Sequence, residues 1–330
     1  MKRSAFLALA AVPLLPARAR AQEDADPATT SSRPALRVLL GNGDATPAGD
    51  GTFSFGGRSY RGSFSRLQDG RVVNVVDLEA YLWSVVPREM PPSWPAAALQ
   101  AQAICARTYV LQRSDPRRQY DLVPSEVNQV YGGIANESPA AAAAVDATAG
   151  GVLTYDGAYA QIAYSSCCGG HTEASADAWG SAPLPYLDGV VCTWCAASPN
   201  YRWTATFELD AVAAPFSSEL APLGSLTDLR IGQRDSSGRA RAFTLVAQRG
   251  SLDVKGTAFR LAVGARALRS LLVTGVRPPQ DGSVALDGGG LGHGVGLCQW
   301  GARGMAQQNR GAQEIVAYYF PQTRVAYLGR

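Results

Sequence analysis

Residues 77–113 read DLEAYLWSVVPREMPPSWPAAALQAQAICARTYVLQR, and they predict two helices joined by a proline-rich segment. Asp77 is a residue type that caps helix N-termini, and we expect Pro87 to end the first helix. Ser93 is the expected cap of the second helix, which is rich in alanine. Its small and apolar side chains form one stripe that predicts close packing against a neighbour: Leu99, Ala103, Ala106 and Val110.

Strand-like patterns surround this pair of helices. Residues 35–76 alternate apolar runs with Gly and Asp turns, and a hairpin is expected to turn at Asp156. A third helix is expected at 139–148. Residues 203–287 predict a possible β-rich second lobe with one helix, 262–272. Strands, a helix cluster and further strands, without regular alternation, predict an α+β fold with antiparallel strands.

The N-terminal segment has the layout of an export signal. Residues 1–21 combine a basic start, a short apolar stretch and the end Ala19-Arg20-Ala21, which predicts a cleaved secretory signal peptide rather than a buried helix. Residues 22–34 are polar and predict a flexible leader, so that 35–330 is the folded domain. We therefore expect an exported protein of the periplasm, cell envelope or medium.

Charge and hydropathy exclude two classes of partner. The chain has 330 residues, 46% hydrophobic and 17% charged, which is a globular composition. Without the four basic residues of 1–21, 26 basic residues face 27 acids. This balance argues against a nucleic-acid partner. No run of about twenty apolar residues follows the signal, so no transmembrane span is expected after cleavage.

Cysteine and histidine spacing predicts a structural zinc site. Three thiolates and one imidazole in a Cys-x-x-His and Cys-x-x-Cys arrangement make a complete tetrahedral set, which leaves no position for a reacting water. The expected ligands are Cys168, His171, Cys192 and Cys195. Disulfides among these cysteines are the alternative, because exported proteins commonly form them. Cys105 lies in the alanine-rich helix and is expected to be a buried small side chain.

Three polar segments are candidates for ligand binding. Glu89 stands between prolines, and a stiff, apolar setting would suit a general acid, although a solvated loop carboxylate is the alternative. Gln129 and Tyr131 on a turn would suit a hydroxyl-rich ligand. The glycine-rich loop 288–296 holds His293, which is either a ligand contact or a loop histidine bonded within the fold.

Taken in order, these segments resemble the stage II sporulation protein D (SpoIID/LytB) family. The resemblance extends from about residue 70 to 328. The motifs that carry it are SVVPREM (84–90), NQVYGG (128–133), AVDATAGGVLTYDG (144–157), YSSCCGGHTEASADAWG (164–180), PYLDGVVCTWC (185–195), GARALRSLLV (264–273) and GHGVGLCQWGA (292–302).

The resemblance implies a peptidoglycan lytic transglycosylase. Such an enzyme cleaves glycan strands between N-acetylmuramic acid and N-acetylglucosamine and leaves 1,6-anhydro ends, with a preference for glycan stripped of stem peptides. Glu89 stands at the position of the family's catalytic acid. The resemblance carries over the following substrate-site positions: Arg107, Tyr109, Gln129, Tyr131, His293 and Gln299. We expect a cleft near residues 89, 107, 129 and 293.

Two departures and two rival functions accompany the resemblance. Cys298 and Trp300 stand where the last motif usually has Ser and Tyr, and Ser165 stands where many members have His. Some members bind zinc near the Cys-Gly-Gly motif, and here the set would have to use His171.

The first rival is a non-catalytic glycan-binding partner that enhances an N-acetylmuramoyl-L-alanine amidase. The second is a disulfide-stapled binding domain of the cell envelope.

Overall fold

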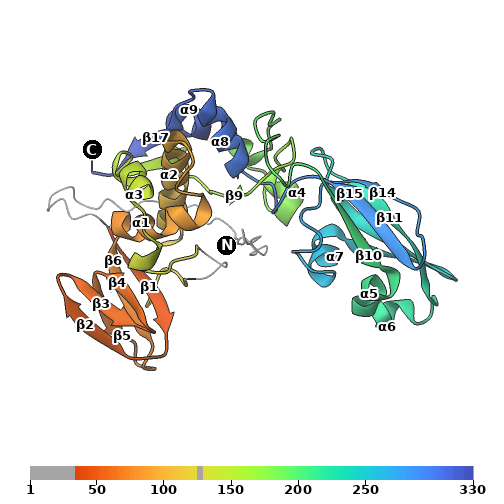
Figure 1. Ribbon diagram of the computed structural model, residues 1–330, viewed down its shortest axis with the longest axis horizontal. Coiled ribbons are helices and arrows are strands. Elements are labelled where there is room, and N and C mark those ends of the chain that lie inside the picture. Colours follow the sequence, from red (N-terminus) through yellow and green to blue (C-terminus); the bar gives the residue numbers. More distant parts are fainter. Residues whose placement is uncertain (1–33, 125–128, 330) are drawn as a thin grey trace. The chain divides into compact units, whose positions relative to one another are not determined.

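The structure is a computed structural model that describes residues 34–124 and 129–329 (Figure 1). Helices are mixed with antiparallel strands in several small sheets, which confirms the α+β prediction. The predicted signal peptide and all of the predicted leader except Pro34 lie outside the described residues. In the described part of the chain, no helix is long and apolar enough to cross a membrane.

The described chain forms two compact units, which we name by their contents. Within the described residues, the helical unit comprises 34–124, 129–162, 310–317 and 322–329. The cysteine unit comprises residues 163–309 and 318–321.

The helical unit begins with six strands in two small antiparallel sheets. Their bounds are β1 (Ala35–Gly41), β2 (Ala45–Gly49), β3 (Thr52–Phe55), β4 (Arg58–Arg61), β5 (Ser63–Arg66) and β6 (Val72–Asp77). One sheet has the order β1-β6-β5 and the other β2-β3-β4. In the first sheet Leu36 pairs with Val76, and both side chains are buried. This apolar face places the end of β6 at the start of the first helix.

Three helices follow, with bounds α1 (Leu78–Glu89), α2 (Ala96–Arg113) and α3 (Pro139–Asp146). Asp77 caps α1 as predicted, because its side chain accepts hydrogen bonds from two first-turn backbone N–H groups. The predicted small-residue stripe of α2 is buried. Such a stripe lets backbones approach closely, and α2 packs against α1, α3 and the strand that follows α3.

A short 3-10 helix, a hairpin and two C-terminal elements complete the helical unit, and the last two residues of α9 belong to the cysteine unit. The bounds are η1 (Ile134–Asn136), β7 (Gly151–Tyr155), β8 (Ala158–Tyr159), α9 (Ala312–Tyr319) and β17 (Arg324–Tyr327). Asp156 and Gly157 have φ of 47° and 78°, the left-handed values that a two-residue hairpin turn of this kind requires. The predicted hairpin is therefore confirmed. β17 pairs antiparallel with β7.

The cysteine unit combines a loop-rich part with a strand-rich part. Its loop-rich part contains β9 (Tyr164–Ser165), α4 (Ser175–Trp179), η2 (Pro185–Leu187), β16 (Leu297–Cys298) and α8 (Gln299–Gln307). β9 and β16 pair in parallel, so two of the motifs found in the sequence lie side by side.

The strand-rich part covers the range where the sequence predicts a second lobe. Its bounds are β10 (Trp203–Glu208), α5 (Leu209–Ala213), η3 (Ala214–Phe216), α6 (Ser217–Leu220), β11 (Leu226–Arg234), β12 (Ala240–Ala247), β13 (Gly250–Lys255), α7 (Gly256–Ala262), β14 (Val273–Val276) and β15 (Ser283–Gly288). The two sheets have the orders β11-β12-β13 and β10-β15-β14. They share an apolar core in which the rings of Phe243 and Phe259 stack with centroids 4.3 Å apart.

Several predicted helix boundaries are wrong. Pro87 does not end α1, because it lies in the last turn, where its missing N–H removes only one helical bond. The helix stops at Met90, whose extended conformation is the one favoured before a proline. Ser93 does not cap α2, which begins after Pro95 without a side-chain cap.

The helix predicted at 262–272 does not form. The helix here is α7, which ends at Ala262. Gly264 has a φ of 96°, a left-handed value that interrupts a right-handed helix. The third helix, α3, ends at Asp146, two residues before the predicted end.

Candidate functional site

Glu89 is the last residue of α1. Glu89 is 8% exposed. The backbone N–H of the next residue, Met90, donates a hydrogen bond to the Val86 carbonyl. Pro87 precedes it in the last turn, and Pro91 restricts the residue after it. Glu89 is therefore a largely buried residue at a stiff helix end.

Arg107 lies inside the helical unit and has no exposed surface. Its Nε and Nη2 donate to the two carboxylate oxygens of Glu79 at 2.9 and 2.6 Å. Nη1 donates to the Gly151 carbonyl at 2.8 Å, and Nη2 also reaches the Val145 carbonyl at 3.3 Å. This bidentate pair joins α1 and α2 to the end of α3 and to β7. The structure therefore places Arg107 in a buried pair between helices; the substrate contact that the resemblance implies for it stays a prediction.

Gln129 and Tyr131 also bond inward. Tyr81 donates its hydroxyl proton to Gln129 Oε1 at 3.0 Å, and Gln129 Nε2 donates to the Ala106 carbonyl at 3.3 Å. Tyr131 donates its hydroxyl to Asn74 Oδ1 at 2.8 Å. Burial raises the pKa of Tyr81 well above its usual value, so this phenol stays protonated. These bonds hold the loop containing both residues against α1 and β6.

Tyr109 is 7% exposed, and the Arg113 guanidinium carbon lies 3.7 Å from its ring centroid. The ring is therefore covered on one face by a cation from the next turn of α2. Glu89, Arg107, Tyr109, Gln129 and Tyr131 all belong to the helical unit.

The remaining two substrate-site candidates belong to the cysteine unit, where His293 lies in the glycine-rich loop. Val295 N–H donates to His293 Nδ1 at 2.9 Å, so the ring proton is on Nε2. The backbone of Tyr164 forms a further hydrogen bond with the ring. Both nitrogens thus bond within the fold. Gln299, at the start of α8, is 4% exposed.

Burial and two neighbouring arginines keep the His293 imidazole neutral. Burial, and after it the positive charges of Arg260 and Arg239, lower the pKa of His293 to about 4. The Trp179 ring lies against the imidazole, with centroids 5.4 Å apart.

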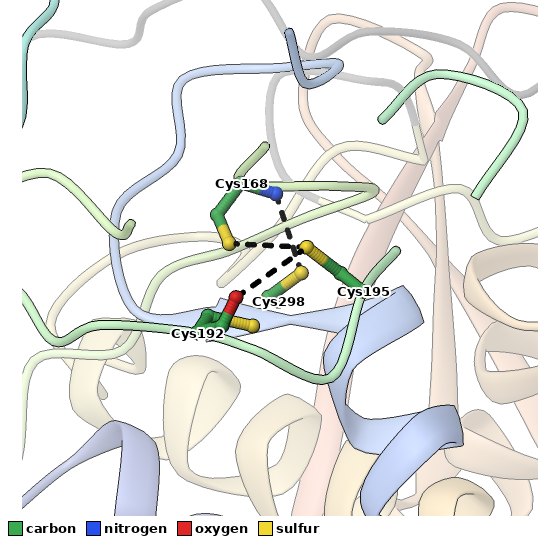
Figure 2. A group of neighbouring side chains, drawn as sticks. All are labelled: Cys168, Cys192, Cys195 and Cys298. Atoms are coloured by element: carbon green, nitrogen blue, oxygen red, sulfur yellow. Dashed lines mark hydrogen bonds between the residues drawn. The ribbon is translucent and has the colours of Figure 1, made fainter. Parts of the chain in front are cut away.

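Four buried cysteines meet in the cysteine unit and could hold a metal ion (Figure 2). Their sulfur atoms all lie within 4.8 Å of one another. Tetrahedral zinc with Zn–S bonds of about 2.3 Å needs S–S distances of about 3.8 Å. The Cys168 and Cys195 sulfurs are 3.6 Å apart, close to that value. The other two members are Cys192 and Cys298.

The fourth member of this cysteine cluster corrects the predicted set. Cys298, at the end of β16, occupies the place expected for His171. His171 Nδ1 instead lies 2.6 Å from the Thr172 carbonyl, and its backbone bridges to Val191. The correction follows from the β9–β16 pairing, which brings Cys298 next to the Cys-Cys-Gly-Gly turn. The sequence contained one signal for this correction, because Cys298 stands where the family usually has serine.

The comparisons with known proteins agree with these motifs. The family model described as Stage II sporulation protein matches residues 67–155, which contain Glu89, Arg107 and Tyr131. A second model, a domain of unknown function (DUF8618), matches residues 193–296.

Three curated relatives illustrate the similarity. An uncharacterised protein of Brachyspira hyodysenteriae is 32% identical over 274 residues, which cover 81% of this chain and 72% of the relative. Stage II sporulation protein D of Bacillus amyloliquefaciens is 29% identical over 75% of this chain and 74% of its own length. The amidase enhancer of Bacillus subtilis is 28% identical over 73% of this chain, but only 40% of the relative is covered. By these matches and its motifs, the chain belongs to the stage II sporulation protein D family.

Proposed function

We propose that this protein is an exported lytic transglycosylase that cleaves the glycan strands of peptidoglycan in cell-wall remodelling or division. The observation that carries the proposal is the buried carboxyl of Glu89 at the end of α1. A carboxyl group held in a fixed direction at a helix end is suited to proton transfer to a bound glycan. Family membership and the names of the relatives support a role at the cell wall.

One carboxyl group is sufficient for the proposed reaction. Glu89 would donate its proton to the glycosidic oxygen as the bond from C1 of N-acetylmuramic acid to that oxygen breaks. The C6 hydroxyl of the same sugar would then bond to C1 and pass its proton to the Glu89 carboxylate. The products are a free hydroxyl on the leaving sugar and a 1,6-anhydro ring, and the acid is regenerated. Ordinary glycosidases need a second carboxyl because water or the enzyme supplies the nucleophile.

Inward-facing polar residues support this reaction by positioning α1. The Glu79–Arg107 pair fixes the first turn of the helix that ends at Glu89. Tyr81 lies two turns before Glu89 and is held by Gln129. The direction of the Glu89 carboxyl therefore depends on side chains that need not touch the glycan.

Zinc is the ion that we propose for the four cysteines. Thiolates prefer zinc over magnesium or calcium, and four of them leave no open position for water. The ion would be structural. It would join the Cys-Cys-Gly-Gly turn, the Cys192–Cys195 segment and the start of α8, with Cys298 in place of His171.

A non-catalytic amidase enhancer is the second candidate function. It is favoured by the relative that carries this name. It is also favoured by the inward hydrogen bonds of Arg107, Gln129 and Tyr131, which leave fewer side chains free to act on a substrate than the resemblance implied.

Digestion of purified glycan strands would separate the two functions. Strands with and without stem peptides are incubated with wild type, Glu89→Gln and the control Glu314→Gln, and the products are identified by mass spectrometry. Glu314 is exposed, so its substitution should not affect cleavage. We expect 1,6-anhydro ends from wild type and Glu314→Gln, and a loss of about 10²–10⁴-fold in Glu89→Gln. A folded wild type that binds glycan but cleaves neither substrate would favour the amidase enhancer.

A further inference from the structure

A small pocket lies in the cysteine unit between α4, α7 and the glycine-rich loop. Its volume is about 30 Å³, which is enough for about two water molecules or a chemical group of similar size. Its lining includes Ala178 and Trp179 of α4, Arg260 and Leu261 of α7, and His293 of the loop. All of these residues lie within one compact unit, so the pocket is a feature of the cysteine unit alone.

Arg260 brings hydrogen-bond donors to this pocket. The residue is 7% exposed. Its Nε donates to the Leu268 carbonyl at 2.8 Å, and Nη2 donates to the carbonyls of Ala265 and Arg269 at 3.2 and 3.0 Å. A guanidinium group carries its N–H donors in one plane, and these three bonds use only Nε and Nη2. Within the described part of the chain Nη1 has no acceptor, so its N–H groups are available to a ligand.

Glu173 brings hydrogen-bond acceptors to the same pocket. It is 4% exposed and belongs to the lining. Its Oε2 lies 3.4 Å from Arg239 Nε, and its carboxyl group also bonds with the side chain of Asp235. The two oxygens of a carboxyl group can accept further bonds beside these, and at least one accepts whether the group is ionised or protonated. Glu173 and Arg260 form no ion pair with each other, so the pocket contains a donor and an acceptor that the fold leaves apart.

Most of the remaining lining is apolar or already hydrogen-bonded. His293 accepts a hydrogen bond from the Val295 N–H at Nδ1, and its ring also bonds with the backbone on the other side. It therefore offers the pocket the surface of its ring. Ala178 and Trp179 are partly exposed, and Leu261 is 55% exposed. An aromatic and an aliphatic side chain at the opening of a pocket suit the carbon face of a sugar ring.

These features favour an uncharged ligand group over a charged one. A carboxylate could pair with Arg260 but would bring a second acid against Glu173, and an ammonium group would bring a second cation beside Arg260. A secondary amide can use both residues, because its carbonyl oxygen accepts a hydrogen bond and its N–H donates one. The methyl group of an acetamide is also small enough for the apolar side of the pocket.

We propose that this pocket binds the acetamido group of an N-acetylated sugar. Arg260 Nη1 would donate to the acetamido carbonyl, and Glu173 would accept a hydrogen bond from the acetamido N–H. The methyl group would lie against Ala178 and the ring of Trp179. The choice of sugar rests on the proposed function, since both sugars of the peptidoglycan glycan carry an acetamido group at C2.

Such a pocket would select glycan by its N-acetyl groups. A longer acyl chain would exceed the volume of about 30 Å³. A sugar without the amide would leave Arg260 Nη1 and Glu173 without the bonds that the acetamido group supplies, and leaving buried polar groups unbonded weakens binding.

The test compares uncharged trisaccharides that differ only at C2. They are triacetylchitotriose, the same chitotriose carrying butanoyl groups, and cellotriose, which has hydroxyl groups at these positions. Each is titrated into the full protein, and binding is measured by calorimetry. We expect the acetyl form to bind at least about tenfold more tightly than either of the others, because a longer acyl chain or a missing amide loses the bonds to Arg260 and Glu173.

A signal from Trp179 would show where the ligand binds. Protein labelled with fluorotryptophan gives a separate fluorine NMR signal for each tryptophan, and the signal of Trp179 is the one that Trp179→Phe removes. This signal should shift when the acetyl form is added and should stay in place with cellotriose.

The test variant is Ala178→Leu, which fills the pocket from a partly exposed position. It should reduce the preference for the acetyl form to less than about twofold. The matched control is Ala176→Leu, which lies on the same helix, is also partly exposed and is not part of the lining, so that it should keep the preference. Arg260→Gln should also lose the preference, but it disturbs three bonds to the backbone, so Ala178→Leu decides if Arg260→Gln folds poorly.

Equal binding of the trisaccharides, no binding of the acetyl form, or an unchanged preference in Ala178→Leu would overturn the proposal. The cleavage assay shows separately whether the proposed function fails. A protein that prefers the acetyl form but cleaves no glycan keeps the acetamido pocket and loses the transglycosylase, whereas glycan cleavage without this preference does the reverse.

Discussion

The backbone N–H of Cys168 donates a hydrogen bond to the sulfur of Cys298, 3.2 Å away, although 130 residues separate them in sequence. Cys298 ends β16 and caps α8, where the Gly301 N–H also donates to its sulfur at 3.3 Å. The Cys-Cys-Gly-Gly turn and the glycine-rich motif are thereby joined at one thiol (Figure 2). An ion bound by the four cysteines would hold both motifs through this residue.

Substitution of Cys298 should therefore remove the proposed zinc. We expect Cys298→Ala to purify without zinc and to unfold about 5–10 °C below wild type, because metal binding contributes directly to folding. His171→Ala should keep stoichiometric zinc, since this histidine lies outside the cysteine cluster. Elemental analysis and thermal scans would measure both effects. Loss of metal in His171→Ala, or cysteines that resist alkylation in denaturant until they are reduced, would contradict the four-thiolate site.

Breaking the Glu79–Arg107 pair should strongly destabilise the helical unit. Both side chains are at most 3% exposed, so Glu79→Gln leaves a buried guanidinium without its counter-charge and should cost about 3–5 kcal/mol. The control is Glu314→Gln, in the exposed Arg310–Glu314 pair, which should cost less than about 1 kcal/mol. Urea unfolding measures both. The double variant Glu79→Leu/Arg107→Met removes both charges. If it is no more stable than Glu79→Gln, the unpaired charge of Arg107 is not the cause of the lost stability.

Neutral His293 should make stability depend on pH. An unfolded histidine binds its proton below about pH 6.5, but His293 in the fold has a pKa of about 4. Between these values the unfolded state holds more protons, so stability rises with pH and is lost on acidification through this window. Relative to His293→Gln, wild type should lose roughly 2 kcal/mol between pH 7 and 4.5. The measurement is urea unfolding of both proteins at each pH. A difference that stays constant with pH would contradict a neutral His293.

A side chain at Gly301 should disturb the cysteine cluster. A Cβ atom there would lie 1.8 Å from the Tyr319 hydroxyl and 2.9 Å from the Cys192 sulfur. Tyr319 is buried and bonded to that sulfur at 3.1 Å, so neither group can move freely. Gly301→Ala should cost about 1–3 kcal/mol and weaken metal retention. Gly311→Ala, where the nearest atom to the new Cβ would be 3.7 Å away, is the control in thermal and metal assays.

Local structure was predictable wherever neighbouring residues decide it. Asp77 caps α1 through bonds to residues two and three positions ahead, and Asp156-Gly157 turns the hairpin because both residues tolerate left-handed backbone angles. Helix ends were less predictable. Pro87 is tolerated in the last turn of α1, and Gly264 interrupts a stretch whose composition favours a helix.

The candidate site also has residues that the sequence could identify and contacts that it could not. Glu89 could be found from its prolines and its motif, because a stiff helix end is a local property. The partners of Arg107 could not be found, since Glu79 lies 28 residues away and nothing local distinguishes an arginine that pairs inside the fold from one that binds a ligand.

By itself the sequence determined the α+β class, the helix cluster with its buried stripe, the hairpin and membership of the family, because short-range periodicity and motif order carry this information. Only the tertiary structure decided that Cys298, rather than His171, joins the other three cysteines. It also decided that Arg107 pairs with Glu79 inside the helical unit. Both depend on contacts between elements far apart in sequence, and these form only when the strands and helices pack together.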